Sequence, residues 1–458
     1  MAFDPLMAVH RFGAGPAWEH AFPTRADDML AEAAAGDPFA ASHPVISVSE
    51  LVALDDRYRG LRRTATRSTD QDEAEAARQE GRTLLRATRD QSTEAFRDLF
   101  LRRLGQPYGL GERLVTFWTD HFTAMGGGGI LQYGTPAFSN ESIRPHIMGR
   151  FADMLKAVVR APLMLTYLDQ SKSVGPNSRL GKRRANRGLN ENLARELLEL
   201  HTLGVGGPYG QRDVVELAEL LTGLVHVRGE GFVFRRNVVE PGAERVLGRE
   251  YSGDDLAAID AFLEDVAVHP VTARHLAEKL AIHFVADRPD DGLVRHISTR
   301  YAASDGSLAE AVAALLEHPA AWSAPRGNVK WPVDFIASGL RAVGVPTRRV
   351  ARLSVRQVRG LLENPIGRMG QRWDRATDPA GWDEEDESWV TPQAVVERVN
   401  WAMRAPARLV PELPDPRELL TLVAGDAPPG ELAFAVSAAE TRREGVGLVL
   451  ASPSFQRR

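Results

Sequence analysis

Apolar side chains recur at helical spacing along most of the chain. Leu84, Phe96 and Phe100, for example, belong to one inward stripe. Ser47 opens another helix with the spacing of a capping box. The stretch 64–80 is polar and charged, and we expect a loop there. The predicted helices span residues 47–63, 82–104, 110–125, 139–169 with a break at Pro162, 190–204, 213–223, 254–267, 270–284, 289–303, 307–317, 330–343 and 391–404.

Period-two alternation is clearest around a glycine turn at 224–238, which predicts a β-hairpin. No change of composition divides the chain. We therefore predict a mainly α fold, with a single large irregular helical domain over residues 1–458 and one small β-hairpin. Residues 1–45 are expected to form an N-terminal arm packed on this body. Residues 371–390 are expected to form an irregular loop rich in tryptophan and acidic side chains.

The predicted helix near the middle of the chain is unusually polar for a leucine-rich segment. Glu191, Arg195 and Glu199 recur every four residues, while Asn192 and Glu196 form a neighbouring row. Residues four apart lie on one face of an α-helix. Two rows of carboxylates are therefore expected to flank a single arginine.

Two interpretations of this helix remain open. In the first, Glu196, Glu199 and Glu191, together with His121, are catalytic residues of a hydrolase that acts on a glycan or polyol-like substrate by general acid–base chemistry. The surrounding leucines would raise the pKa of one carboxyl, and Arg195 would keep another ionised. In the second, the same side chains form a structural ladder, and the protein is a non-catalytic binding or scaffold protein that acts with an enzyme partner.

Candidates for substrate binding come from several segments. Asn192 and Arg195 lie on the central helix, and Trp118 lies on a predicted helix with an aromatic face. Arg144 follows on the next polar segment. Lysine is scarce in this arginine-rich sequence, which draws attention to Lys330. These side chains would line a pocket between the central helix, the aromatic helix and the segment around Lys330.

Tryptophan is concentrated in the C-terminal part, and Trp382 is our candidate for a platform under a sugar ring. The alternative is that these rings anchor a long loop, because each buries a large apolar area. Six of the eight tryptophans lie in this part: Trp322, Trp331, Trp373, Trp382, Trp389 and Trp401.

The amino-acid composition argues against several classes of catalytic site and partner. The absence of cysteine excludes disulfides, thiol nucleophiles and cysteine zinc sites. A metal site of Glu196, Glu199, His121 and His201 is weakly supported, because no metal-binding spacing such as His-Glu-x-x-His occurs, and no cofactor is indicated. The net charge of -5 gives no reason to expect a nucleic-acid partner. No apolar run is long enough to span a membrane and no signal peptide is visible, so we expect a soluble cytoplasmic protein.

The run from Asn190 to Gly204 resembles the signature of a large bacterial family, domain of unknown function 1800. Supporting matches extend over nearly the whole chain, and the resemblance implies one family-wide unit but no activity. Relatives are often exported and encoded beside a phosphatase- or sulfatase-like protein, which the resemblance suggests as a partner. The matches include Phe117-Trp118, His121-Phe122, Ile143 to His146, Tyr167 to Asp169, Leu221 to Gly223, His283 to Val285, Val329-Lys330, Met369 to Gln371, Gly381-Trp382 and Ser452 to Arg458.

The sequence departs from the family pattern after the predicted hairpin. Relatives often carry a His-Asp pair before a glycine and a lysine, whereas this chain has Val239, Glu240, Gly242 and Arg245 at the matching positions. A catalytic role of that histidine in relatives would not carry over to this protein.

Overall fold

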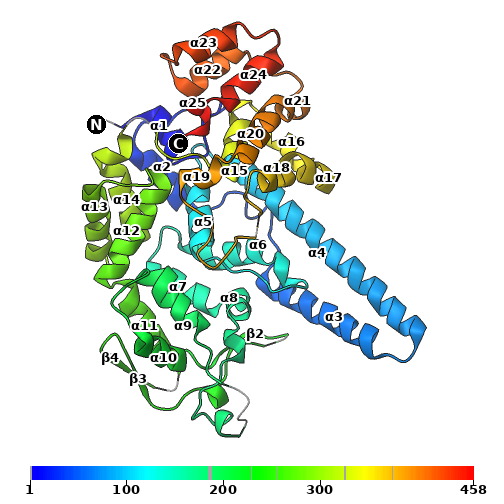
Figure 1. Cartoon of the computed structure of the whole chain (residues 1–458), viewed down its shortest axis with the longest axis vertical. Helices are drawn as coiled ribbons and strands as arrows, with labels where there is room; N and C mark the ends of the chain where they lie inside the picture. The colour runs from blue at the N-terminus through cyan, green and yellow to red at the C-terminus, as the bar shows by residue number, and fades with distance from the viewer. Residues whose placement is uncertain (1–2, 184–187, 228, 254, 324–325, 374) are drawn as a thin grey trace.

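A computed structural model describes residues 3–183, 188–227, 229–253, 255–323, 326–373 and 375–458. Helices dominate the described chain and strands are few, which confirms the mainly α fold (Figure 1). The N-terminal helices are α1 (Pro5–Arg11), α2 (Ala26–Ala34), α3 (Val48–Arg67), α4 (Gln71–Gly105), α5 (Leu110–His121), α6 (Thr135–Phe138), α7 (Phe151–Arg160), α8 (Pro162–Tyr167), α9 (Asn192–Glu196) and α10 (Gln211–Leu220).

Most predicted helices of the C-terminal part appear within a residue or two of their expected ends, because prolines and capping side chains mark those ends locally. The helices are α11 (Leu256–Ala267), α12 (Pro270–Phe284), α13 (Asp291–Ala303), α14 (Leu308–Glu317), α15 (Pro332–Ala342), α16 (Thr347–Ala351), α17 (Val355–Val358), α18 (Asn364–Arg368), α19 (Asp386–Trp389), α20 (Pro392–Arg404), α21 (Pro406–Leu409), α22 (Pro416–Ala424), α23 (Gly430–Ser437), α24 (Arg442–Ala451) and α25 (Pro453–Gln456).

Short helical segments of other geometry connect these elements. The 3₁₀ segments are η1 (Leu131–Tyr133), η3 (Arg144–His146), η4 (Gln170–Lys172), η5 (Gly181–Arg183), η7 (Arg236–Val238) and η8 (Pro319–Trp322). The π-helical segments are η2 (Ser139–Ile143), η6 (Leu197–Thr202) and η9 (Arg359–Glu363). π-Segments are rare and frequently lie at functional sites.

The prediction of a loop at 64–80 is wrong. Helices α3 and α4 form a long antiparallel pair that projects from the body (Figure 1). The Asp70 carboxylate accepts the backbone N–H groups of Asp72 and Glu73 and so starts α4. Arg57 pairs with Glu80 across the two helices at 2.5 Å. A polar sequence was therefore compatible with helix, because charged side chains can cover an exposed helical pair.

The predicted β-hairpin is present as an antiparallel pair of β1 (Leu224–Val227) and β2 (Gly231–Phe234), while position 228 in its turn lies outside the described residues. A second pair, β3 (Ala243–Val246) and β4 (Arg249–Ser252), was not predicted. Its turn places Leu247 at φ 52° and Gly248 at φ 79°. Leucine is unusual in this left-handed conformation, so the sequence carried no turn signal there.

Buried apolar side chains form two main clusters. The first extends from α1 to η8 and the second joins the end of α4 to the helices from α15 onward. The segment 1–45 contributes directly to the first cluster, since the Phe12 ring packs against Phe284 and Trp322 at centroid distances of 5.8 and 5.3 Å. The N-terminal arm is therefore part of the packed interior.

The central helix predicted at 190–204 begins and ends as expected but changes geometry within. Asn190 accepts the backbone N–H of Asn192, and Gly204 adopts φ 84° at the C-terminal end. After α9 the chain widens into η6, in which the N–H of Leu203 reaches the carbonyl of Leu198. This wider turn rotates the later side chains relative to those before it.

Candidate functional site

The carboxylate row of the central helix lies on the surface. Arg195 pairs with Glu191 at 3.1 Å, and their side chains are 42% and 36% exposed. Arg195 also donates to Gln211, and Asn192 is exposed. Within the described residues Glu199 makes no ion pair with Arg195, because η6 interrupts the α-helical spacing between them. The expected three-residue ladder is thus reduced to one solvated pair.

Glu196 is half-buried, and burial followed by the charge of Glu199 raises its pKa. Its environment is therefore less polar than that of a free carboxylate. None of the residues from 190 to 204 lines the cavity described below. Glu199 is close enough to Glu196 for its charge to act there, while Glu191 is paired with Arg195, and none of the three lines that cavity.

Trp118 and His121 point into the core. Trp118 is 0% exposed, and its ring packs against His121 and Phe122. The His121 Nε2 atom lies 3.2 Å from the carbonyl oxygen of His201, and burial holds the pKa of His121 well below its usual range. Both side chains therefore have the environment of core residues.

Lys330 is buried in a different part of the molecule. Its ammonium group lies 3.2 Å from Nδ1 of His10, 3.2 Å from the Ser338 hydroxyl and 4.0 Å from the centroid of the Phe455 ring. Burial, followed by the charge of Arg326, holds the pKa of Lys330 well below its usual range. Lys330 therefore serves to join the N-terminal segment to α15 and α25.

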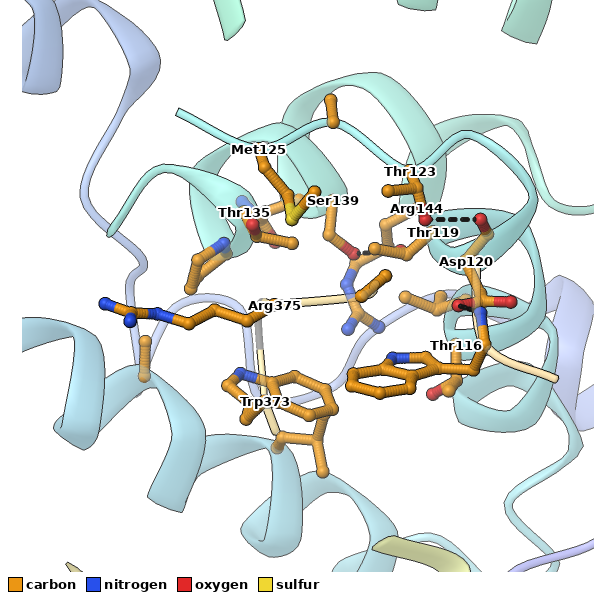
Figure 2. Close-up of a pocket in the computed structure, with 18 of the residues that line it drawn as sticks. Thr116, Thr119, Asp120, Thr123, Met125, Thr135, Ser139, Arg144, Trp373 and Arg375 are labelled. Carbon is orange, nitrogen blue, oxygen red and sulfur yellow. Dashed lines mark hydrogen bonds between the residues drawn. The ribbon is translucent and has the colours of Figure 1, made fainter. Parts of the chain in front are cut away.

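A partly open cavity of about 100 Å³ lies between α5, η2 and the loop 371–390. It is similar in scale to the engineered cavity of about 150 Å³ that holds benzene in another protein. Figure 2 shows Asp120 and Arg375 on opposite sides of this space, with Trp373 along one wall. Its lining includes Thr116, Thr119, Asp120, Thr123, Ser139, Asn140, Arg144, Trp331, Gln371, Trp373, Arg375 and Trp382.

Helix α5 supplies the polar wall because Thr116, Thr119 and Asp120 lie three and four residues apart on one face. The Thr119 and Ser139 hydroxyls are 2.7 Å apart, which joins α5 to η2 (Figure 2). The N-terminus of α5 is fixed by Glu32, whose carboxylate accepts the N–H groups of Tyr108 and Gly109 at 2.7 Å. The wall is therefore held at both ends.

Asp120 is enclosed by the loop. Its carboxylate accepts the backbone N–H of Trp382 at 3.0 Å. A Cβ atom at Gly381 would lie 2.5 Å from the Asp120 Oδ2 atom, and Gly381 has φ 93°. Glycine is thus required here for close approach and for backbone conformation. Burial, and next the charge of Glu384, raises the pKa of Asp120 well above its usual range, which favours a neutral carboxyl.

Glu384 is a second, partly buried carboxyl whose charge acts on Asp120, although Glu384 is not among the residues that line the cavity. Its oxygens lie 2.8 and 3.0 Å from Nδ1 of His283, and Arg113 donates to Nε2 of the same ring at 3.2 Å. Arginine cannot accept a hydrogen bond, so Nε2 must be the acceptor and Nδ1 carries the proton. Burial raises the pKa of Glu384 to about 7, and its side chain is 19% exposed. This carboxyl can change protonation near neutral pH.

A cluster of buried charged side chains holds Arg113 and His283 in position. The Asp334 carboxylate accepts hydrogen bonds from Arg103 at 2.5 Å and from Arg458 at 2.9 Å, and it also accepts one from Arg113. These side chains are at most 6% exposed. Buried charges of this kind are costly unless paired, so Asp334 fixes the position of Arg113 and through it the His283 ring.

Two of the predicted substrate-binding residues, Arg144 and Trp382, do line the cavity. The guanidinium of Arg144 makes a two-point contact with Glu112, so its charge is already compensated. The indole N–H groups of the lining residues Trp331 and Trp373 are buried and have no hydrogen-bond partner among the described residues.

Sequence reasoning missed Asp120 and Glu384. The available signal for Asp120 was its place in an aromatic helix, one residue before the candidate His121. Glu384 lay in an acidic run that contains several similar residues. Only tertiary contacts distinguish these two carboxyls from their neighbours: residue 382 with Asp120, and His283 with Glu384.

Metal ligands and membrane segments can also be assessed in the described part of the chain. It contains no group of three or more His, Cys, Asp or Glu side chains arranged to hold a metal ion. No helix in the same residues combines the length and the apolar character that crossing a bilayer requires.

Comparison with known proteins identifies the family but not an activity. No curated protein and no solved structure matches the chain. The profile of a family described as "Protein of unknown function (DUF1800)" matches residues 7–457. The protein is therefore a member of the DUF1800 family.

Proposed function

We propose that the protein is a hydrolase that acts on a glycan or polyol-like molecule bound in the cavity beneath the loop 371–390. The observation that carries the proposal is the placement of the Asp120 carboxyl near Glu384 in the wall of a cavity that Trp373 and Trp382 also line. Aromatic faces suit the apolar face of a sugar ring, and hydroxyl and amide groups suit its hydroxyls. Thr116, Thr119, Ser139 and Asn140 provide such groups.

In this proposal Asp120 is the general acid. Burial raises its pKa well above the usual range, which favours the protonated carboxyl, and that proton can be transferred to a leaving oxygen. Glu384 is the proposed base that assists attack by water, because its pKa of about 7 leaves a large ionised fraction at neutral pH. His283 orients Glu384, and Arg113 orients His283.

The alternative is a binding or scaffold protein without turnover. Two observations favour it: the loop covers the Asp120 carboxyl closely, and three valines close in sequence at the end of the loop and the start of α20 are exposed, Val390, Val395 and Val396. Such a group suits contact with another protein. The family resemblance suggests a phosphatase- or sulfatase-like partner for that surface.

The two functions are separated by measuring turnover of a glycan panel by the parent protein, with and without a chelator. If Asp120 is the acid, Asp120→Asn should lower turnover by about a hundredfold or more, because the amide keeps the contact with Trp382 but cannot supply the proton. The matched control Glu196→Gln, on the central helix outside the cavity, should retain turnover within about twofold.

The other outcomes would indicate a different catalytic site, a different reaction or no catalysis. Turnover that survives Asp120→Asn but is lost in Glu196→Gln would place the chemistry on the central helix. Turnover abolished by chelator alone would indicate a metal-dependent reaction. Glycan binding without turnover in the parent would support the binding-protein alternative.

A further inference from the structure

Two further depressions lie beside the cavity. The nearer one, a groove of about 640 Å³, is lined by Arg89, Arg372 and Arg375 and shares Trp373 and Arg375 with the cavity. The groove and the cavity therefore lie next to each other at Trp373 and Arg375.

The second depression, of about 700 Å³, adjoins the groove. It shares Asn364 with the groove and is lined by Arg86 and Arg356. Arg86 and Arg89 are three residues apart and lie on one face of α4. We call Arg86, Arg89, Arg356, Arg372 and Arg375 the arginine strip.

The arginine strip carries positive charge that the described protein does not neutralise. All five residues are exposed, and four of them make no side-chain hydrogen bond or ion pair with any described residue. The fifth, Arg375, donates to the neutral amide of Gln132 at 3.0 Å. This local excess contrasts with the net charge of -5 of the whole chain.

The acidic residues nearby are already paired. Asp90 and Glu363 line these depressions, and both interact with Arg359, at 2.7 and 3.9 Å. Arg368, which also lines the groove, pairs with Glu397 at 2.6 Å. The strip therefore retains five guanidinium groups that are available to an anionic ligand.

We propose that the arginine strip binds the acidic groups of a glycan whose end enters the cavity, so that the substrate class is an acidic oligosaccharide. This inference rests on the proposed function for the role of the cavity. Guanidinium groups bind carboxylates and sulfates through two parallel hydrogen bonds. Five of them in two contiguous depressions match a ligand with repeated negative charges.

The strip favours a glycan over a single-stranded nucleic acid. Strands without sequence preference are held by aromatic side chains on which successive bases stack. In the groove the aromatic side chains are Phe96, which is buried, and Tyr133 and Trp373, which are partly buried. The second depression has none among its described lining residues.

The test is calorimetric binding of three oligosaccharides to the full chain: oligogalacturonate as the carboxylate probe, sulfated dextran as the sulfate probe, and neutral dextran. We expect one or both acidic probes to bind, with affinity that falls as salt is added, and neutral dextran to bind at least tenfold more weakly. The double variant Arg372→Gln/Arg375→Gln should weaken binding of the acidic probe by about tenfold or more.

The matched control is Arg417→Gln, an exposed arginine at the start of α22 that lies outside both depressions. It should change affinity by less than about twofold. Equal weakening by control and double variant, equal binding of neutral and acidic dextran, or tighter binding of a single-stranded RNA oligonucleotide would overturn the proposal. The single variant Arg89→Gln tests the strip from a different element if the double variant does not fold.

The test also separates this inference from the proposed function. Acidic oligosaccharides that bind through the strip without being cleaved would support the strip and count against the hydrolase. Cleavage of neutral glycans with no preference for acidic ones would support the hydrolase and count against the arginine strip.

Discussion

The central helix and the wall beneath the loop 371–390 use the same chemistry in opposite environments. On the central helix, Glu191 and Arg195 form an ion pair that is more than one-third exposed. Beneath the loop, Asp334 and its three arginines are at most 6% exposed. Water screens the first pair, so it contributes little to stability, whereas the second cluster becomes very costly if one partner is lost.

The two regions also differ in where their carboxyls with raised pKa values lie relative to the cavity. Glu196 is half-buried and has a raised pKa, but it lies outside the cavity. Asp120 lines the cavity and Glu384 interacts with it from outside the lining, and burial is the main cause of the raised pKa values of both. A high density of carboxylates along a helix is therefore a weaker indicator of a site than the burial of two carboxyls beside a cavity.

The largest expected effect is at Asp334. Asp334→Asn would remove the carboxylate that Arg103, Arg113 and Arg458 share and leave buried positive charge without a partner. We expect the free energy of unfolding to fall by about 3–5 kcal/mol in urea titrations. The matched control is Glu191→Gln, which removes a carboxylate from a solvated pair. A similar loss in both variants would contradict the contrast between the two regions.

The next effect concerns pH. The Glu384 carboxyl has a pKa of about 7 in the folded protein and about 4.5 in the unfolded chain, so between these values the folded state binds more protons. Stability contributed by Glu384 is therefore lost as pH rises from 4.5 to 7. As pH rises over this window, the unfolding free energy of Glu384→Gln should increase relative to that of the parent by up to about 3 kcal/mol.

This pH effect is measured as the difference between the urea unfolding free energies of parent and variant at pH 4.5 and pH 8. Titrating groups distant from Glu384 are common to both proteins and cancel in the difference, whereas Asp120 and His283 interact with Glu384 and contribute to it. A difference that does not change with pH would show that Glu384 is solvated and has an ordinary pKa.

A smaller effect is expected where the loop meets Asp120. A methyl group at Gly381 would lie 2.5 Å from the Asp120 carboxylate, at a backbone conformation that L-residues rarely adopt. Gly381→Ala should cost about 1–3 kcal/mol and loosen the loop, which would lower the pKa of Asp120 as water enters. The variant is compared with Gly430→Ala, where nothing lies within 4 Å. Equal melting temperatures for the two variants would exclude the tight contact.

The smallest effect is expected for Arg195→Ala. Because Arg195 is 42% exposed and its contact is with an exposed glutamate, the free energy of unfolding should change by less than about 1 kcal/mol. Chemical denaturation at low and high salt measures this. A loss of 3 kcal/mol or more would show that the central helix is desolvated in solution, and would return attention to Glu196 and Glu199.

The sequence by itself determined the family, the helical class and the ends of most helices. Caps and turn glycines act within a few residues, so Ser47, Pro270 and Gly204 mark helix ends without help from the rest of the chain. The hairpin at β1 and β2 was predictable for the same reason. The central helix could not be predicted in detail, because whether it widens into η6 depends on how its leucines pack.

Only the tertiary structure decided which polar residues share a cavity. Asp120 is enclosed by residues 381 and 382, which are more than 260 positions away in sequence, and Glu384 meets His283 across 101 positions. The same holds for Lys330, which contacts His10 across 320 positions. The pKa of a carboxyl or an amine depends on the solvent and charge around it, and these are set by distant segments that no local pattern records.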